Sequence, residues 1–552
     1  MRLATTLLAG WLCASAAAPL LASEAQTQVD RADPSVVEEE LKDPQPAAKR
    51  PPRILQVAPS ETRSSALEGT VAIGAIRIDG ARALSQASFA SVIERYVGRT
   101  LSPSDLRALA TGIAGVAREA GYGLATAWIP PQQVGNGVLR VGIDEGTIDA
   151  LDVTGTGSDA VKARLAPLAD GEPLKTAELE RRLLIADDLP GIRLGKAKLV
   201  HKGNRNVLVL SAVKDRVEGR VQIDNWGTGT SGPVRARLSV DINALLADDD
   251  RLSVEAVTTP LEPNELALGR AAYTVSLGTG GTEVTVGGYV ARSEAGAVLS
   301  ARDFDGKSSE LEAEVRHPLI RSRDASVWAG VAGSLRNSEQ TRQDIVVRDD
   351  RVITFTGSLY GFQQLANGRL RGRLAFVQGV DILGATRASD PLRSRSDADG
   401  RFSKLEFWGE FEHRLGYDFS ILLQAEGQLV GGPLLSSEEM GLGGRAFGRA
   451  WDFREYSGDR GIASSLELRF DWEKPLSMLE MVQLYAYLDG GTVANLGTGT
   501  GGGSLASVGL GTRLWLPSRI RASAQLGIPL TQSTSNGKRS DPRLSVTFDK
   551  KF

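Results

Sequence analysis

From about residue 218 to the C-terminus, apolar and polar residues alternate along many short stretches of the chain. In GPVRARLSVDIN (232–243), every second residue is apolar, and Arg235, Arg237 and Asp241 are among the polar residues between them. A period of two is typical of a strand with one dry face and one wet face. We predict sixteen such strands. Their expected first residues are Gly219, Pro233, Arg251, Ala267, Thr282, Lys307, Asp324, Arg348, Gly368, Arg401, Tyr417, Gly461, Met481, Ser504, Arg519 and Pro542.

The connectors between these strands alternate in length. Those after odd-numbered strands tend to be long, such as 383–400 and 432–460, and those after even-numbered strands tend to be short, such as GTGG (278–281). The last strand is amphipathic and ends on Phe552. This combination is typical of an outer-membrane barrel with short periplasmic turns, whereas a soluble sandwich or propeller predicts no such alternation. We therefore predict a 16-stranded antiparallel transmembrane β-barrel over 218–552, with the charged residues of 232–243 lining a wet lumen.

Two smaller units precede the barrel, at 73–149 and 150–217. Each shows the order strand, helix, helix, strand, strand, which indicates an internal repeat of two α/β domains. Ser102 and Asp105 predict a capping box for one helix, and Ser85 and Thr176 are expected to cap two others. The open edges of such sheets suit the capture of an extended peptide by strand addition.

The first 72 residues differ from the rest of the chain. Residues 1–23 have an arginine, a short apolar run and small residues, which predicts a signal peptide; the alternative is a short membrane anchor. Residues 24–72 are polar and rich in proline, as in a linker, but DPSVVEEELK (33–42) predicts an isolated helix. The only cysteine, Cys13, lies in the predicted signal peptide, so disulfides are not expected in the exported protein. No later stretch has the 18 consecutive apolar residues of a membrane-spanning helix.

Composition and motifs argue against catalysis. The 64 basic and 67 acidic residues nearly balance, which gives no indication of nucleic-acid binding. His201, His317 and His413 lack the spacing of metal ligands or of a nucleophile with its base. DADG (397–400) lacks the distal glutamate of a calcium loop, and TGTGGG (498–503) lacks the frame of a phosphate loop. The sequence therefore predicts no enzyme activity, no metal and no cofactor.

Three longer stretches point to one family: IPPQQVGNGVLRVGIDEGTI (129–148), GEPLKTAELERRLLIADDLPGI (171–192) and VQIDNWGTGTSGPVRARLSVDIN (221–243). They resemble, in this order, the first POTRA domain, the second POTRA domain and the first barrel hairpin of two-partner secretion transporters, the haemolysin secretion/activation family. The resemblance extends over nearly the whole exported chain. The residues that match the first POTRA signature are Pro131, Gln132, Gly137, Leu139, Glu145 and Gly146.

The connector 432–460 contains GLGGRAFGRAWDFREYSGDRG (441–461), which resembles that family's sixth outer loop. A loop of this length is expected to fold back into the lumen, where Arg449 would form a bidentate pair with Asp489. Arg445 is a competing candidate for the tip arginine, and a tip arginine exposed to lipopolysaccharide is the alternative to the pair. The matching residues are Arg449, Ala450 and Trp451 at the tip, with alanine in place of the family's glycine, Gly458, Asp459 and Gly461 at the exit, and Tyr487, Asp489 and Gly491 on the barrel wall.

The resemblance implies a pore in the outer membrane of a Gram-negative bacterium. Such a pore recognises one large exoprotein, an adhesin, a cytolysin or similar, through periplasmic POTRA domains and secretes it unfolded without nucleotide hydrolysis. Its other partners would be outer-membrane lipid, lipopolysaccharide and the barrel-assembly machinery that inserts it. The helix at 33–42 is expected to plug the pore, as in some members, unless this segment is a disordered linker. A barrel assembly or insertion factor of the same superfamily is the alternative, although such factors usually carry more POTRA repeats; a porin needs no POTRA pair.

Overall fold

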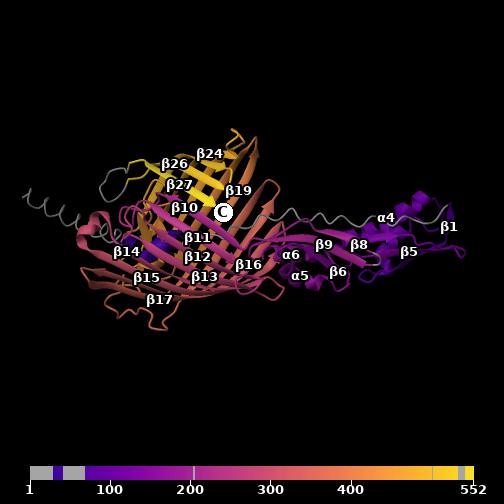
Figure 1. Ribbon diagram of the computed structural model, residues 1–552, viewed down its shortest axis with the longest axis horizontal. Helices are drawn as coiled ribbons and strands as arrows, with labels where there is room; N and C mark the ends of the chain where they lie inside the picture. Colours follow the sequence, from indigo (N-terminus) through magenta and orange to yellow (C-terminus); the bar gives the residue numbers. More distant parts are fainter. Residues whose placement is uncertain (1–28, 42–68, 203–204, 500, 533–540) are drawn as a thin grey trace, which may run out of the picture.

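The computed structural model describes residues 29–41, 69–202, 205–499, 501–532 and 541–552. Two α/β domains extend from one end of a β-barrel, and a short helix lies inside the barrel (Figure 1). The predicted signal peptide (1–23) and most of the predicted linker lie outside the described residues.

The barrel is closed and has sixteen antiparallel strands, which confirms the predicted fold class. Its first strand, β10 (Val217–Asp224), pairs with its last, β27 (Arg543–Lys551), so no sheet edge is left unpaired in the membrane. Every strand begins within three residues of its predicted first residue. The other strands are β11 (Arg235–Asn243), β12 (Asp250–Thr258), β13 (Ala267–Leu277), β14 (Thr282–Glu294), β15 (Phe304–Arg321), β16 (Ala325–Arg342), β17 (Ile345–Leu365), β18 (Gly368–Gly379), β19 (Ser403–Gly416), β20 (Phe419–Val430), β23 (Arg460–Glu473), β24 (Met481–Ala494), β25 (Gly503–Leu516) and β26 (Ile520–Pro529).

The seam between β10 and β27 is reinforced by a side chain. The strand register ends at Asp224 opposite Thr547; at the next residue, the Asn225 backbone N–H donates to the Val546 carbonyl at 3.2 Å and the side-chain amide adds two further bonds. Asn225 Oδ1 accepts a hydrogen bond from the Val546 N–H at 2.6 Å, and Asn225 Nδ2 donates to the Leu544 carbonyl at 2.9 Å. A side-chain amide carries the same donor and acceptor as a peptide group, so the Asn225 side chain strengthens the closure where the strand register ends.

The two faces of the strands separate as the alternation predicts. Arg235 and Arg237 are buried inside the barrel, whereas Leu238, one position further along the strand, is 46% exposed on the outer face. The same exposure of large apolar side chains recurs around the barrel, where they meet lipid. Examples are Val254, Val290, Leu311, Val331, Leu359, Leu374, Leu423, Leu466, Leu488, Leu510 and Val546.

Connector lengths follow the predicted alternation with two exceptions. Residues 343–344 alone join β16 and β17, although this connector follows an odd-numbered strand. These strands have 18 and 21 residues, well beyond the roughly ten that cross a bilayer, so the hairpin itself projects outward in place of a long loop. The other exception is the seven-residue turn 474–480, after an even-numbered strand.

The first α/β domain has the sheet order β2–β5–β4 with a separate β1–β3 pair. The predicted capping box is present: the Ser102 hydroxyl accepts from the Asp105 N–H, and Asp105 Oδ2 accepts from the Ser102 N–H at 2.9 Å. The Ser102 hydroxyl also lowers the pKa of the Asp105 carboxyl through its hydrogen bond. Ser85 forms no cap bond, and the helix predicted after it is split into two short pieces. The elements are β1 (Val71–Ile73), β2 (Ala75–Asp79), η1 (Gln86–Phe89), α3 (Ala90–Ile93), β3 (Arg99–Leu101), α4 (Pro103–Glu119), β4 (Thr126–Trp128) and β5 (Val138–Asp144).

The second α/β domain repeats this plan, and Thr176 links it to the first. The predicted capping role of Thr176 is wrong, because Lys175 occupies the N-cap position of α6 and no side chain caps the helix. The Thr176 hydroxyl instead accepts from the Gly123 N–H at 2.9 Å and donates to the Gly121 carbonyl at 3.2 Å. The elements are β6 (Ala150–Thr154), α5 (Ser158–Leu165), η2 (Ala166–Leu168), α6 (Thr176–Asp187), β7 (Ile192–Leu194), β8 (Lys198–Lys202) and β9 (Arg205–Lys214).

The second domain docks on the short turns of the barrel. The Arg321 guanidinium donates to both carboxylate oxygens of Asp188, at 2.7 and 2.8 Å. Arg182 Nη1 donates to the Thr279 carbonyl at 3.2 Å in the neighbouring turn, which joins β13 to β14. The end of the barrel with the short turns therefore faces the α/β domains.

Candidate functional site in the barrel lumen

The long connector between β20 and β23 folds back into the barrel. Its two arms pair as β21 (Met440–Leu442) and β22 (Tyr456–Gly458). Gly448 has a backbone φ of +72°, so the left-handed residue of the tip is this glycine, and Ala450 needs no such conformation. The loop packs on the wall through buried apolar side chains: Met440, Leu442, Phe447, Ala450, Trp451, Tyr456, Ala463, Val493 and Leu505.

At the tip, Arg449 is buried in a set of inward-facing polar side chains. Its Nε donates to Asp489 Oδ2 at 2.7 Å, its Nη1 to Glu467 Oε1 at 2.6 Å and its Nη2 to Ser465 Oγ at 2.7 Å. The structure thus brings Arg449 and Asp489 together, but the expected bidentate pair is wrong, because the guanidinium divides its donors among three partners. Asp489 is engaged on its other side by the Ser507 hydroxyl, which leaves one oxygen for the arginine. Sequence reasoning missed Glu467, although alternation along β23 places it on the same face as Ser465.

Two tyrosines of β24 support this cluster. The Arg449 guanidinium lies 3.6 Å from the centre of the Tyr487 ring, and the Arg513 guanidinium lies 3.9 Å from the centre of the Tyr485 ring. Arg513 also pairs with Glu467 at 3.1 Å. A Cβ at the facing glycines of β25 would overlap these rings, so the glycines make room for them. These glycines are Gly509, opposite Tyr487, and Gly511, opposite Tyr485.

The loop exit is fixed by Asp459, which is fully buried. Its carboxylate accepts from Arg395 Nη1 at 2.6 Å, from the Leu434 N–H at 2.7 Å and from the Leu496 N–H at 2.6 Å. These partners belong to three different outer connectors, so one carboxylate ties three connectors together. Burial also raises the pKa of nearby Glu439, which pairs with Arg395, to about 7.

The glycines predicted around the exit allow close backbone approach. A Cβ on Gly458 would lie 2.8 Å from the Ala494 nitrogen, and one on Gly461 would lie 3.0 Å from Met440 Sδ of the loop. A Cβ on Gly491 would lie 2.8 Å from Leu442 Cδ1 of the loop. Larger residues at these three positions would push the loop away from the wall.

Two other arginines of the loop differ from Arg449. Arg445, the competing candidate, is exposed and lines the open part of the lumen. Arg454 is 1% exposed, has a backbone φ of +50°, and donates from Nη2 to the Ser436 carbonyl at 2.8 Å. No pattern in the sequence pointed to Arg454, because both its burial and its left-handed backbone depend on the folded loop.

The helix predicted at 33–42 is present as α2 (Pro34–Leu41) and lies within the lumen (Figure 1). Glu40 pairs with Arg235 of β11 at 2.5 Å, and Glu38 forms an ion pair with Arg270 of β13. The apolar side of α2 packs on the wall at Val257, Leu266, Leu268, Tyr289 and Ala291 through Val37 and Leu41.

The residues before α2 contact both the wall and the sixth loop. Asp30 pairs with Arg348 of β17 at 2.5 Å. Arg31 donates from Nε to the Arg454 carbonyl at 3.1 Å and from Nη2 to Glu455 at 2.7 Å. The helical segment and the loop are therefore in direct contact with each other inside the barrel.

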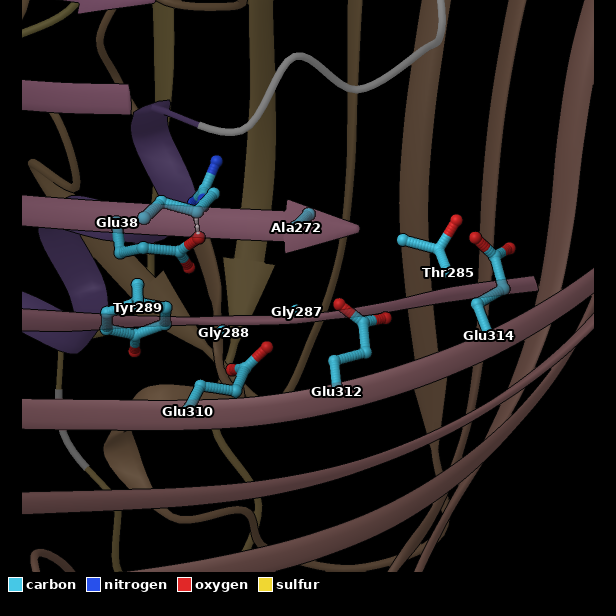
Figure 2. A pocket seen from close by; sticks show the side chains of 10 residues that line it. Glu38, Ala272, Thr285, Gly287, Gly288, Tyr289, Glu310, Glu312 and Glu314 are labelled. Atoms are coloured by element: carbon cyan, nitrogen blue, oxygen red, sulfur yellow. Dashed lines mark hydrogen bonds and ion pairs between the residues drawn. The ribbon is translucent and has the colours of Figure 1, made fainter. Parts of the chain in front are cut away.

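The space that remains in the lumen is polar. A cavity of about 1160 Å³ lies between α2, the sixth loop and the wall, and it is lined by both acidic and basic side chains. A smaller one of about 160 Å³ lies beside Glu38, where Figure 2 shows Glu310, Glu312 and Glu314 in a row along β15. The arrangement provides a wet passage that α2 and the sixth loop occupy.

The residues of the first POTRA signature hold that domain together. Glu145 is buried and accepts three backbone hydrogen bonds, from the N–H groups of Arg82, Ala83 and Leu84 at 2.7–2.8 Å. Gln132 bonds both backbone groups of Arg140 in β5 with its amide, at 2.7 and 2.9 Å. Of the remaining signature residues, Leu139 is fully buried, and Gly137 and Gly146 have left-handed backbone conformations, with φ of +67° and +91°. Pro131 directly precedes Gln132 in the chain.

Replacing Glu145 with alanine should loosen the 82–84 segment. Three N–H groups would lose their buried, charged acceptor, and we expect amide exchange there to rise by about 100-fold. Hydrogen exchange of the full-length protein measures this. Glu119→Ala, at the exposed end of α4, should leave exchange unchanged; equal protection in the Glu145 variant would show that the carboxylate does not hold the segment.

Within the described residues, no group of three or more His, Cys, Asp or Glu side chains is placed to hold a metal ion. In the same part of the chain, no helix has the length and apolar character needed to cross a membrane. His317 hydrogen-bonds Thr282 at 2.8 Å, and His413 stacks on Phe411.

Comparison with known families gives two matches. Residues 203–514 match the model described as haemolysin secretion/activation protein ShlB/FhaC/HecB, and residues 71–146 match the ShlB-type POTRA domain. The first match covers more than half of the chain.

Known proteins and structures agree with these matches. The chain is 24% identical over 368 residues to the heme/hemopexin transporter protein HuxB of Haemophilus influenzae (strain 86-028NP), and the alignment covers 64% of each, just under two thirds of that relative's length. Its fold is similar to CdiB from Escherichia coli, with a TM-score of 0.70 at 18% identity over 90% of this chain and 94% of that one. It is also similar to BamA from Haemophilus ducreyi lacking POTRA domains 1–3, with a TM-score of 0.52 at 12% identity over 88% and 100%.

Proposed function

Because this chain belongs to the haemolysin secretion/activation family, we propose that it is the outer-membrane pore that secretes one large exoprotein of a two-partner system. The protein lies in the outer membrane with its POTRA domains in the periplasm. The exoprotein, an adhesin, a cytolysin or similar, would bind the POTRA domains and cross the barrel unfolded. No nucleotide hydrolysis is required if folding outside the cell draws the chain outward.

The main support for this proposal is that two segments of the chain itself fill the lumen. Two separate segments, α2 and the sixth loop, occupy a polar passage and are attached to its wall through ion pairs, such as Glu40–Arg235 and Arg449–Asp489, as well as through apolar side chains. When such a segment leaves a wet lumen, both members of each ion pair regain water, which limits the net cost of separating them; removing one member alone leaves the other charge buried and is costly. We infer that α2 plugs the resting pore and leaves it when the exoprotein enters.

Deleting residues 73–149, the first POTRA domain, should abolish export while the barrel still folds. Export is measured as the amount of the exoprotein encoded beside this chain that reaches the medium of a host carrying both genes. The altered gel mobility of the unheated barrel reports its folding. Continued export by the deletion variant would show that the first POTRA domain is not the receptor.

A barrel assembly or insertion factor is the second candidate, since the similarity to BamA shows that this fold is shared with such proteins. Two POTRA-like domains are described here, fewer than such factors usually carry. Loss of this chain would then change the insertion of other barrels. Export of the exoprotein with unchanged levels of other barrels would argue for the transporter.

A further inference from the structure

Four aromatic side chains form a patch on the inner wall beside the periplasmic mouth. Trp328 of β16 stands opposite Tyr360 of β17 and stacks on it, with 5.6 Å between the ring centres. Phe362 lies 6.1 Å from the same tryptophan. Trp408 of β19 is linked to these rings through Arg371, which stands opposite Phe362 in the sheet and lies over the Trp408 ring, and it lines the large cavity. The rings face inward, because Leu359, next to Tyr360, is 47% exposed on the outer face while Tyr360 and Phe362 are buried.

Three arginines place their guanidinium groups on these rings. They come from β15 and β18, the strands that flank β16–β17. The pairs are Arg321–Trp328, Arg369–Phe362 and Arg371–Trp408, each with 5.5 Å from the guanidinium carbon to the ring centre. We call these four aromatic residues and three arginines the entry belt.

The entry belt does not anchor either of the two segments that fill the lumen, α2 and the sixth loop. Tyr289 packs with α2, and Tyr485 and Tyr487 lie under arginines of the sixth-loop site. Among the described residues, no hydrogen bond, ion pair or ring contact joins the entry belt to α2 or to connector 431–459. The buried hydroxyl of Tyr360 also has no hydrogen-bond partner within the described structure. The resting contacts of the lumen therefore do not account for these rings.

The belt adjoins the docked second POTRA domain. Arg321 stacks on Trp328 and at the same time holds Asp188, the residue after α6, with two hydrogen bonds of 2.7 and 2.8 Å. Arg181 of α6 donates to the Pro318 carbonyl at 3.0 Å on the same side of the mouth. A chain that enters the lumen along this domain would therefore pass Arg321 and Trp328.

We propose that the entry belt is a binding site for extended, unfolded polypeptide. The belt would hold the aromatic and aliphatic side chains of that polypeptide. This inference rests on the proposed secretion function. Ring faces and stacked guanidinium planes bind apolar and aromatic groups without requiring one sequence. Elsewhere the large cavity is lined mainly by charged and other polar side chains, which offer little to the apolar residues that an unfolded chain exposes. The belt thereby gives such a chain a first hold inside the barrel.

Cross-linking to defined peptides tests the site directly. Full-length protein in lipid nanodiscs carries benzoylphenylalanine in place of Trp328 or Trp408, or in place of Ser523. Ser523 lines the lumen on the opposite side and lies three residues into β26, as Trp328 does in β16. The probes are a 20-residue glycine–serine peptide with interspersed Phe and Leu, and a glycine–serine peptide of the same length and charge.

At the two belt positions, the Phe/Leu peptide should cross-link about fivefold more than its control, which corresponds to one modest aromatic contact. At Ser523 the two peptides should label equally and weakly. Equal labelling by both peptides at the belt, or the same preference at Ser523, would overturn the proposal.

An export assay separates this inference from the proposed function. A Trp328→Leu/Trp408→Leu variant should export the exoprotein about fivefold more slowly at an unchanged level of folded barrel. Trp472→Leu is the matched control, since Trp472 is 53% exposed on the outer face. Normal export by the double variant would overturn the belt and leave transport intact. If the unmodified protein itself fails to export, the proposed function fails, and the peptide cross-linking still decides the belt.

Discussion

Export should fall at least about tenfold when Arg449 is replaced with alanine, while the barrel remains folded and inserted. The substitution leaves two buried carboxylates, Asp489 and Glu467, without the guanidinium that lies between them. Breaking a buried ion pair by removing one partner costs about 3–5 kcal/mol, enough to detach the loop tip from the wall. Strand pairing does not involve this side chain, so heat-modifiable mobility should be retained. Exoprotein in the medium and the folded fraction of barrel are the two measurements.

Two further variants define the role of the guanidinium. Arg445→Ala, in the same loop but exposed, should export normally. Arg449→Lys should be intermediate, because a single ammonium cannot match the planar set of donors that reaches three partners at once. Undiminished export by Arg449→Ala would show that the sixth-loop contact with the wall is not needed for transport.

Removing both wall-facing carboxylates of α2, in a Glu38→Ala/Glu40→Ala variant, should open the resting pore. Each carboxylate pairs with an arginine of the wall, Glu38 with Arg270 and Glu40 with Arg235. If together they contribute about 3 kcal/mol, the ratio of plugged to open barrels falls roughly 100-fold. Conductance of the full-length protein in planar bilayers should rise accordingly. Cells should also become sensitive to bulky antibiotics that the intact outer membrane excludes.

The residue between these two glutamates provides the control. The Glu39 side chain is half exposed, and its ion pair with Arg454 is long, at 4.0 Å. Glu39→Ala should therefore conduct like the unmodified protein. Arg235→Ala, which removes a wall partner instead, should open the pore as the helix variant does. Unchanged conductance in the double variant would mean that the sixth loop alone closes the lumen.

The release of α2 and the position of the sixth loop are expected to influence each other. Arg31 joins the helical segment to the loop through the Arg454 carbonyl and Glu455. Any change that favours departure of the helix also removes these contacts from the loop. The two predictions above therefore concern one connected obstruction, with separate points of attachment to the wall.

The sequence by itself determined the architecture of this protein. A strand that crosses a bilayer must separate a lipid face from a lumen face, so the period of two marks each strand and places every residue on one face. For this reason the count of sixteen and the first residues of the strands were predictable. The capping box of α4 was equally predictable, because its donors and acceptors lie within four consecutive residues.

Only the tertiary structure decided which inward-facing residues meet. Alternation assigns Glu467, Asp489 and Trp328 to the lumen, but it does not say how high each stands on the wall or what folds in against it. The division of Arg449 among three partners, the burial of Arg454 and the placement of α2 against Arg235 and Arg270 all depend on strand register and on a loop that returns to the wall. The hydroxyl of Thr176 likewise bonds across to the neighbouring domain instead of capping its own helix. The physical reason is that face selection is a local property of the chain, whereas ion pairs and ring contacts act over a few ångströms between residues that are distant in sequence.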